Sequence, residues 1–269
     1  MRIVMKIGGA LDGAGERQLR LALATCRSLQ HEVIVVHGGG PEISRRLAQA
    51  GIELPFVDGL RLTTTEAMPI VEAALRTCNE RLAGQLACDG VRFLPMIDDT
   101  VVGARDTGHL QTGDVSHVHS NPLLNAWTEG LIPLLPPYGR DGEGRLFNLN
   151  ADTVAAHVAR ALCADKLIFC TNVSGVFADF AAGEQLFDVT VEKLKDHVSS
   201  GSFSAGMIPK VTAMLYAAAH GIRETWVVDG SDGQSLDYAI RRAALDADTT
   251  RSCYGTCLIA NPTYTEVHE

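Results

Sequence analysis

Short, uninterrupted apolar blocks recur along the chain and end at glycines. The blocks at 2–6 and 33–36 are followed by Gly8-Gly9 and by the triplet Gly38-Gly39-Gly40. A continuous apolar block, in contrast to an alternating one, is typical of a strand that is buried on both faces of a parallel sheet. Between the two blocks, the leucines of residues 19–29 have helical spacing. The chain therefore begins with a strand, a helix and a second strand.

The alternation of strand and helix continues to the end of the chain. Residues 93–120 differ, because they are polar and interrupted by glycines, which predicts hairpins and loops at the rim. The fold class that this pattern predicts is α/β, as a single three-layer αβα sandwich with a mainly parallel central sheet. We expect further strands at 130–135, 166–170, 224–228 and 256–260, and helices at 42–50, 152–163, around Lys210 and at 237–244.

Composition narrows the class of protein. The 269 residues are 46% hydrophobic, with a mean hydropathy of +0.08, so the chain can bury a large core. The net charge of −9 argues against broad attraction to nucleic acid or to an anionic membrane. No apolar run approaches the ~20 residues that span a bilayer, and the start of the chain lacks the apolar region of a signal peptide. We therefore expect a cytoplasmic protein with reduced cysteines, no resident metal, and neither a nucleic-acid nor a membrane partner.

The glycines after the first two strands are candidates for an anion site. Without a Cβ in the way, backbone N–H groups approach an anion closely, and the dipole of the following helix adds favourable potential. A flexible turn is the alternative explanation. Neither loop has the GxxxxGK[ST] or GxGxxG spacing of common nucleotide-binding motifs. Lys6 ends the first strand, where a buried cation is costly unless it meets an anion such as phosphate.

Seven motifs follow one another in a fixed order along nearly the whole chain. They are Lys6-Ile7-Gly8-Gly9, His37-Gly38-Gly39-Gly40-Pro41, Asp58-Gly59-Leu60-Arg61, Asn148-Leu149-Asn150-Ala151-Asp152, residues 171–175, Gly206-Met207-Ile208-Pro209-Lys210 and Gly255-Thr256. Each one alone is weak evidence. Together they resemble the amino acid kinase family and, within it, the enzymes that act on N-acetyl-L-glutamate.

The resemblance implies the chemistry of the site. Lys6 and Lys210 would stabilise the transferring phosphoryl group, and Asp152 would hold both lysines in position. The substrate would be bound by backbone N–H groups and by amide and guanidinium side chains: Gly9, Gly39, Gly40, Arg61, Asn148 and Asn150. Arg61 suits the α-carboxylate, because its planar fork forms two parallel hydrogen bonds. The alternative role of Asn148 and Asn150 is to cap the helix that is predicted to begin at Asp152.

The resemblance also implies the reaction and its cofactors. ATP with Mg²⁺ would phosphorylate the γ-carboxylate of N-acetyl-L-glutamate to N-acetyl-γ-glutamyl phosphate, a step of arginine biosynthesis. An N-terminal lobe of about 1–165 would bind the acyl amino acid, and a C-terminal lobe of about 166–269 would bind ATP. The expected ATP-binding residues are Asn172, Val173, Ser174, Gly175, Val176, Phe177, Ser202, Phe203 and Ser204. We further expect a homodimer that arginine does not strongly inhibit, because the chain begins almost directly with its first strand.

Two departures from the family pattern keep alternatives open. Asn172 stands where acetylglutamate kinases commonly have an aspartate, and residues 93–99 replace a Gly-Leu-Ser-Gly-Lys-Asp-Gly-like stretch. One alternative is a kinase for a related or carrier-protein-linked acidic amino acid, glutamate or aminoadipate. The other is a non-catalytic amino-acid-binding regulatory relative. His109, His117 and His119 lack a nearby acid or cysteine cluster, so we interpret them as solvated histidines.

Overall fold

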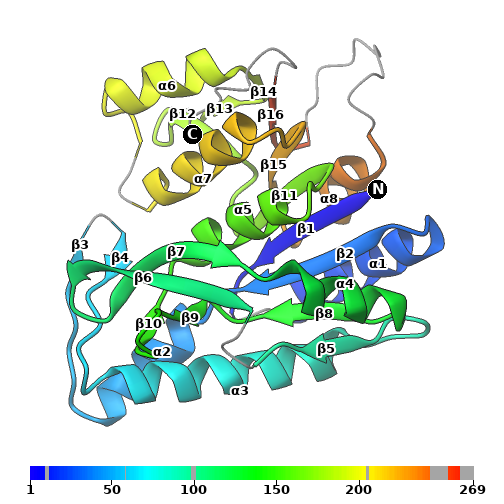
Figure 1. Cartoon of the computed structure of the whole chain (residues 1–269). Coiled ribbons are helices and arrows are strands. Elements are labelled where there is room, and N and C mark those ends of the chain that lie inside the picture. Colours follow the sequence, from blue (N-terminus) through cyan, green and yellow to red (C-terminus); the bar gives the residue numbers. More distant parts are fainter. Residues whose placement is uncertain (10–11, 58, 98–100, 204–205, 243–253, 261–269) are drawn as a thin grey trace.

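A single eight-stranded sheet runs through the molecule (Figure 1). The structure is a computed structural model, and it describes residues 1–9, 12–57, 59–97, 101–203, 206–242 and 254–260. All neighbouring strands of the sheet are parallel except β15 and β16. The order in space is β14 (Asp188–Val189), β16 (Thr256–Ile259), β15 (Glu224–Asp229), β11 (Lys166–Thr171), β1 (Arg2–Ile7), β2 (Glu32–His37), β8 (Ile132–Leu135) and β5 (Phe93–Pro95).

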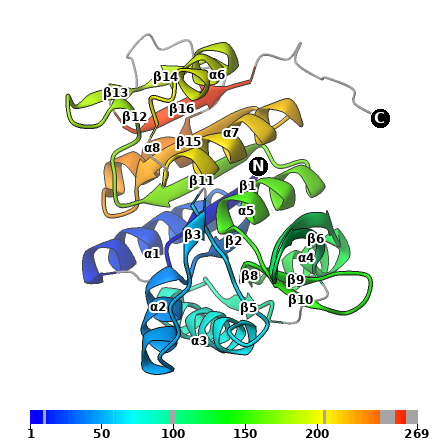
Figure 2. The same ribbon diagram turned by 90° about the vertical axis from the view of Figure 1, so that its left-hand side faces the viewer.

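Helices cover both faces of this sheet, which confirms the predicted αβα sandwich (Figure 2). On one face pack α1 (Gly13–Ser28), α8 (Gly233–Arg241) and the C-terminal part of α3 (Met68–Leu86). On the other face pack α4 (Ser120–Thr128), α5 (Ala151–Ala161), α6 (Val191–Ser199) and α7 (Ile208–Ala219). Helix α2 (Gly40–Gln49) packs on the N-terminal part of α3.

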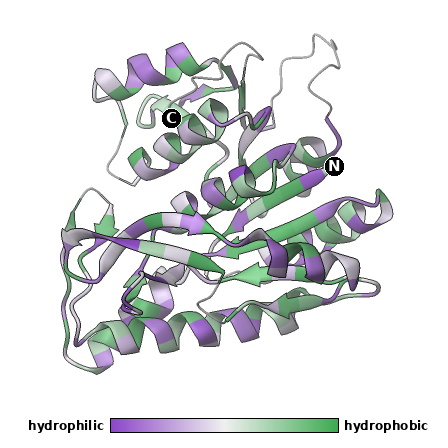
Figure 3. Cartoon of the chain, in the orientation of Figure 1, coloured by the Kyte–Doolittle hydropathy of each residue, from purple (hydrophilic) through white to green (hydrophobic). Residues whose placement is uncertain are grey.

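Burial on both faces explains the apolar blocks of the sequence. In β1, Ile3, Met5 and Ile7 belong to the core on the α1 side, whereas Val4 belongs to the core on the α5 side. Successive side chains of a strand point to opposite faces, so both sets must be apolar. The central strands are accordingly mostly hydrophobic, with hydrophilic residues at some positions such as Arg2 and Lys6, while hydrophobic and hydrophilic residues mix along the helices (Figure 3).

Three small sheets flank the main one. The strands β6 (Val102–His109), β7 (Thr112–Val118), β9 (Tyr138–Arg140) and β10 (Leu146–Asn148) close into a small barrel. The strands β3 (Phe56–Val57) and β4 (Leu60–Arg61) form a hairpin, as do β12 (Val176–Asp179) and β13 (Glu184–Leu186). Among the described residues, no helix is both long and apolar enough to cross a bilayer.

The structure corrects the sequence analysis in three places. Residues 93–120 are not only rim loops, because β5 pairs with β8 as the last strand of the central sheet. Helix α8 begins at Gly233, four residues before the predicted start, and the end predicted at 244 lies outside the described residues. Helices α3, α4 and α6 were not predicted. In α3 the buried side chains nevertheless recur at intervals of three and four residues, as at Val71, Leu75 and Cys78.

Candidate active site

Four parallel strands of the sheet end at one cleft of about 760 Å³. Its lining includes Lys6 of β1 and Gly9 just beyond it, Asn172 after β11, and Ser231 after β15. Pro41, in the helix that follows β2, also lines the cleft. The carboxyl ends of parallel strands meet at one edge of a sheet, and in open α/β folds this edge is where ligands bind.

Lys6, Asp152 and Lys210 meet in this cleft. Lys6 lies two residues after Val4 in β1, so its side chain points to the face that α5 and α7 cover. Its Nζ lies 3.0 Å from Oδ1 of Asp152, and Nζ of Lys210 donates a hydrogen bond of 3.0 Å to Oδ2 of the same carboxylate. Segments distant in the sequence therefore join two ammonium groups to one carboxylate, the arrangement that the sequence analysis predicted.

The charges of this cluster do not balance. Burial opposes the charged form of Asp152, but Lys6 and Lys210 together outweigh it, and the pKa of the carboxyl lies below its usual 3.8. Burial lowers the pKa of Lys210 below 10.5, although Asp152 partly offsets this effect, and the ammonium also lies 4.8 Å from the centre of the Phe169 ring. One carboxylate thus faces two cations. Asp12 and Asp229 also line the cleft, so the positive excess is confined to this cluster, where it favours an anionic ligand.

Four helices direct their N-termini at the same cleft. Gly15 in α1, Pro41 in α2, Asp152 in α5 and Lys210 in α7 each lie within the first three residues of their helix and line the cleft. A helix N-terminus carries a partial positive charge and N–H groups without helical partners. Among the described residues, no side chain caps α2 or α7. The backbone therefore adds to the positive potential that the lysines create.

The two glycine loops require glycine because they approach their neighbours very closely. A Cβ on Gly9 would lie 2.2 Å from the carbonyl oxygen of Gly38, and a Cβ on Gly39 would lie 2.5 Å from Cδ2 of Leu75. Gly40 differs, since nothing lies within 4 Å of a Cβ built there. Close contact thus explains Gly9 and Gly39, whereas Gly40 begins helix α2.

The predicted substrate side chains Arg61, Asn148 and Asn150 lie outside the lining of this cleft. Arg61 stacks on the ring of Phe56 at 4.5 Å and donates a hydrogen bond of 2.7 Å to Ser44, and burial lowers the pKa of its guanidinium. Asn148 donates to Oγ1 of Thr63, whose hydroxyl in turn donates to the backbone oxygen of Arg61. These contacts connect the hairpin of Arg61 to the strand of Asn148.

Asn150 has the capping role that the sequence analysis kept as the alternative. Its side-chain oxygen accepts hydrogen bonds from the backbone N–H groups of Asp152 and Thr153, at 2.9 and 3.0 Å. It is therefore the N-cap of α5. Because Asp152 is the second residue of that helix, this cap fixes the position from which the carboxylate reaches both lysines.

A second pocket of about 690 Å³ lies beside the cleft and collects four of the predicted ATP-binding residues. Val173, Phe177, Ser202 and Phe203 line it, and Asn172 lines the adjoining cleft. Three others hold the loop before β12 in place: Ser174 donates to Gln185, the N–H of Val176 donates to Thr256, and a Cβ on Gly175 would lie 2.5 Å from Thr256. Ser204 lies outside the described residues.

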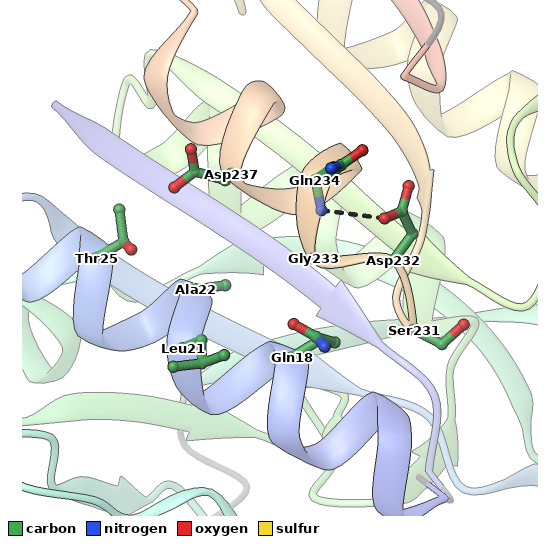
Figure 4. A pocket seen from close by; sticks show the side chains of 9 residues that line it. All are labelled: Gln18, Leu21, Ala22, Thr25, Ser231, Asp232, Gly233, Gln234 and Asp237. Carbon is green, nitrogen blue, oxygen red and sulfur yellow. Dashed lines mark hydrogen bonds between the residues drawn. The ribbon is translucent and has the colours of Figure 1, made fainter.

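Sequence reasoning missed one wall of the cleft. Asp229 ends β15, and its Oδ1 accepts hydrogen bonds from both the N–H and the hydroxyl of Ser231. The sequence signal that could have revealed this wall is Asp229-Gly230, an acidic residue and a glycine at the end of a buried strand. Beyond Ser231, which lines both hollows, a groove of about 540 Å³ runs between α1 and α8 past Gln18 and Asp232 (Figure 4).

The amino acid kinase family model matches residues 1–229, which is most of the chain. The chain belongs to the amino acid kinase family. Among the relatives of this amino acid kinase, acetylglutamate kinase of Symbiobacterium thermophilum is 34% identical over 87% of the chain and 86% of its own length. Acetylglutamate kinase of Cyanidium caldarium is 35% identical over 87% of the chain and 80% of its own length.

Solved structures agree with the fold of this amino acid kinase. The protein smu.665 of Streptococcus mutans superimposes with a TM-score of 0.78 and 27% identity, over 97% of the chain and 99% of its own. Carbamate kinase of Giardia lamblia bound to AMP-PNP superimposes with a TM-score of 0.65 and 13% identity, over 97% and 98% of the two chains. The second likeness concerns the fold alone.

Proposed function

We propose that this amino acid kinase is an acetylglutamate kinase. It transfers the γ-phosphoryl group of ATP to the γ-carboxylate of N-acetyl-L-glutamate and so forms N-acetyl-γ-glutamyl phosphate. The observation that carries the proposal is the meeting of Lys6 and Lys210 on Asp152, with excess positive charge, at the edge of the sheet where helix N-termini converge. The acetylglutamate kinases among its relatives support the choice of substrate and a place in arginine biosynthesis.

The chemistry needs cations more than it needs a base. A side-chain carboxylate has a usual pKa near ~4.3, so the nucleophile is already ionised at neutral pH. The obstacle is the approach of one anion to the negatively charged phosphates. Lys6 and Lys210 lower this repulsion as the phosphoryl group moves between the two oxygens, and Asp152 keeps both ammonium groups aimed at one point. The N–H groups of Gly9, Gly39 and Gly40 would add neutral donors.

The acyl amino acid would lie on the side of the N-terminal lobe, residues about 1–165. Arg61 would bind the α-carboxylate, and Asn148 the region of the N-acyl amide. The contact from Asn148 through Thr63 to the backbone of Arg61 supports this assignment, because it holds both residues in one frame. Asn150 would act through its cap on α5.

ATP would lie on the side of the C-terminal lobe, residues about 166–269. The pocket of Val173, Phe177 and Phe203 offers apolar walls to the adenine, and the adjoining cleft leads past Asn172 to the two lysines. Within the described part of the chain, no group of three or more acidic, histidine or cysteine side chains could hold a metal. A Mg²⁺ ion would arrive on the phosphates, which it would help to neutralise, and would keep several waters.

An assay that traps the product tests the proposal. The protein is incubated with ATP, Mg²⁺ and N-acetyl-L-glutamate, and hydroxylamine converts any acyl phosphate into a hydroxamate. Parallel reactions contain glutamate, N-acetylaspartate or a carrier-linked glutamate or aminoadipate. Hydroxamate from N-acetyl-L-glutamate at the highest kcat/KM is the expected result. A clear preference for another acceptor, or no ATP consumption with any of them, would refute the proposed substrate or the proposed transfer.

The proposal extends to the assembly and its location. We propose a homodimer in the cytoplasm, on the strength of the resemblance to the family. Light scattering coupled to size exclusion measures the molar mass, and one 28.8 kDa chain per particle would contradict the dimer.

A further inference from the structure

Side chains of helix α3 support both glycine loops, which are Gly8-Gly9 after β1 and Gly38-Gly39-Gly40 after β2. Arg81 donates directly to Gly9, whereas Asn79 contacts the ring of His37 at the end of β2, and His37 contacts Gly38. His37 and Asn79 are fully buried, whereas Arg81 is largely exposed. None of the three is in the lining of the cleft. Any effect of these residues on the cleft therefore passes through the loops.

The contacts of Asn79 determine which nitrogen of His37 carries the proton. The Nδ2 group of Asn79 lies 2.8 Å from the backbone oxygen of Leu134 and 3.1 Å from Nε2 of His37. Since a carbonyl oxygen only accepts, Nδ2 must donate to Leu134, and its second hydrogen then points to Nε2. Nε2 is the acceptor in this arrangement. The proton of the neutral ring belongs on Nδ1.

The proton on Nδ1 fixes the first glycine loop. Nδ1 of His37 lies 2.7 Å from the backbone oxygen of Gly38, which also can only accept. Burial lowers the pKa of His37 to about 4, so the ring is neutral at neutral pH and this tautomer is the one that fits both neighbours. In a trans peptide the C=O and the N–H point in opposite directions. Holding the oxygen of Gly38 thus directs the N–H of Gly39 away from His37.

Arg81 fixes the second loop, and the two loops lock together. Nη2 of Arg81 donates a hydrogen bond of 2.6 Å to the backbone oxygen of Gly9. Gly9 in turn lies against the oxygen of Gly38, so closely that a Cβ would come within 2.2 Å of it. A shift of either loop would therefore displace the other. One segment of α3 holds both loops in a single arrangement.

We propose that His37, Asn79 and Arg81 are positioning residues for phosphoryl transfer, which hold the peptide groups of Gly9 and Gly38 so that the loop N–H groups face the moving phosphoryl group. The inference rests on the proposed kinase activity. The inference goes beyond that activity, because these three residues lie outside the lining of the cleft and would change the rate only through the loops. A merely structural role would instead change stability and leave the turnover of each folded molecule unchanged.

Arg81 gives the cleaner test, because its side chain is largely exposed and its replacement leaves the core intact. We expect Arg81→Met to lower kcat about ten- to a hundredfold, since small displacements of a positioned group cost rates of this order. KM for both substrates should change by less than about threefold, because the missing contact acts in the transition state. Arg81→Lys keeps a donor within reach of Gly9 and should recover most of the loss.

The matched control is Arg20→Met, which removes an exposed arginine whose partner is Glu16 in the same helix. It should leave kcat and KM at the wild-type values. Equal kcat for Arg81→Met and Arg20→Met, measured per folded molecule, would overturn the role of Arg81. So would an Arg81→Lys variant as slow as Arg81→Met with an unchanged melting temperature.

The roles of His37 and Asn79 are tested by substitutions and by the protonation state of the His37 ring. We expect His37→Leu to lower kcat about ten- to a hundredfold, while His37→Asn, whose amide can donate to Gly38 in place of Nδ1, recovers part of it. Nitrogen-15 shifts, assigned with His37→Asn, should show Nδ1 protonated and Nε2 bare in the wild type. Asn79→Leu should weaken that preference and lower kcat in parallel. A ring protonated on Nε2 in the wild type, or equal kcat for His37→Leu and His37→Asn, would overturn the inference.

Failure of the inference can be told from failure of the proposed function. An active wild type with variants that keep its kcat contradicts only the positioning role. A wild type that forms no acyl phosphate contradicts the kinase proposal and, with it, the positioning role that depends on it.

Discussion

Two buried lysine and carboxylate clusters lie at opposite ends of the same sheet. Lys166 and Glu224 face each other at the first residues of β11 and β15, with 3.2 Å between Nζ and Oε2 and 2% of each side chain exposed. Lys6, Asp152 and Lys210 lie at the other edge, with 9 to 17% of each side chain exposed. The residue types are the same, but only the second cluster opens on a cleft.

The first cluster is complete by itself. Nζ of Lys166 donates to the backbone oxygens of Ala239, Ile240 and Arg242 at the end of α8, and Oε2 of Glu224 accepts from the indole of Trp226. Burial lowers the pKa of Lys166, and Glu224 partly offsets this. One cation meets one anion. A balanced, fully hydrogen-bonded pair therefore holds structural elements together. An unbalanced cluster at a cleft instead favours the binding of a charged ligand.

The largest expected effect is on the stability provided by the balanced pair. Lys166→Met leaves Glu224 buried without its cation and the end of α8 without its donor. We expect the free energy of unfolding to fall by about 3–5 kcal/mol, the range for breaking a buried pair. Urea unfolding measures it, with the exposed Lys193→Met as control. Turnover per folded molecule should stay at the wild-type value. A stable but inactive Lys166→Met variant would show that Lys166 serves catalysis rather than stability.

The next effect is on the rate supported by the unbalanced cluster. Lys210→Met removes one of two cations, so Asp152 keeps Lys6 as its partner. We expect kcat to fall a hundredfold or more, which corresponds to about 3–4 kcal/mol of transition-state stabilisation, with smaller changes in KM. The free energy of unfolding should change less than in Lys166→Met. Steady-state kinetics and urea unfolding of both variants check this, and a Lys210→Met enzyme within fivefold of the wild type would refute it.

A third, smaller effect sharpens the contrast. Adding Glu224→Gln to Lys166→Met removes the unpaired charge but keeps an oxygen for the indole of Trp226. We expect the double variant to regain most of the lost stability, since replacing a whole buried pair is often neutral. A double-mutant cycle of unfolding free energies measures the coupling. Additive losses would show that Lys166 and Glu224 do not act as a pair.

The smallest effect concerns pH. The pKa of Lys210 in the folded, ligand-free chain lies below its usual 10.5, so kcat/KM should fall with rising pH before 10.5 is reached. Between those two values the unfolded chain binds more protons, and the contribution of Lys210 to stability therefore rises with pH. Asp152 behaves in the opposite manner, because its contribution is complete above 3.8 and is lost as pH falls through its lower folded pKa. A kcat/KM that stays flat up to pH 10.5 would contradict the first expectation.

The sequence predicted strands β1, β2, β8, β11, β15 and β16, the glycine loops and Lys6, but not β5 or β14. These predicted features have local signatures: an apolar block, a glycine run after it, or a charge at the end of a buried strand. Asp152 and Lys210 lie in helices and were predicted only through the resemblance to the family.

The sequence did not predict that Asp229 and Ser231 form a wall of the cleft, or that Asn79 and Arg81 reach the glycine loops from α3. These residues have ordinary helical or loop surroundings. Only the packing of distant segments gives them a role.

By itself, the sequence determined the residue types and the alternation of strand and helix, because both depend on neighbours along the chain. The family resemblance predicted that Asp152 holds Lys6 and Lys210, whereas only the tertiary structure showed that Lys166 pairs with Glu224. The spatial order of the strands, with β1 between β11 and β2, differs from their order in the sequence. Which charges share a cluster, and whether that cluster balances, follows from this order and from where each helix begins.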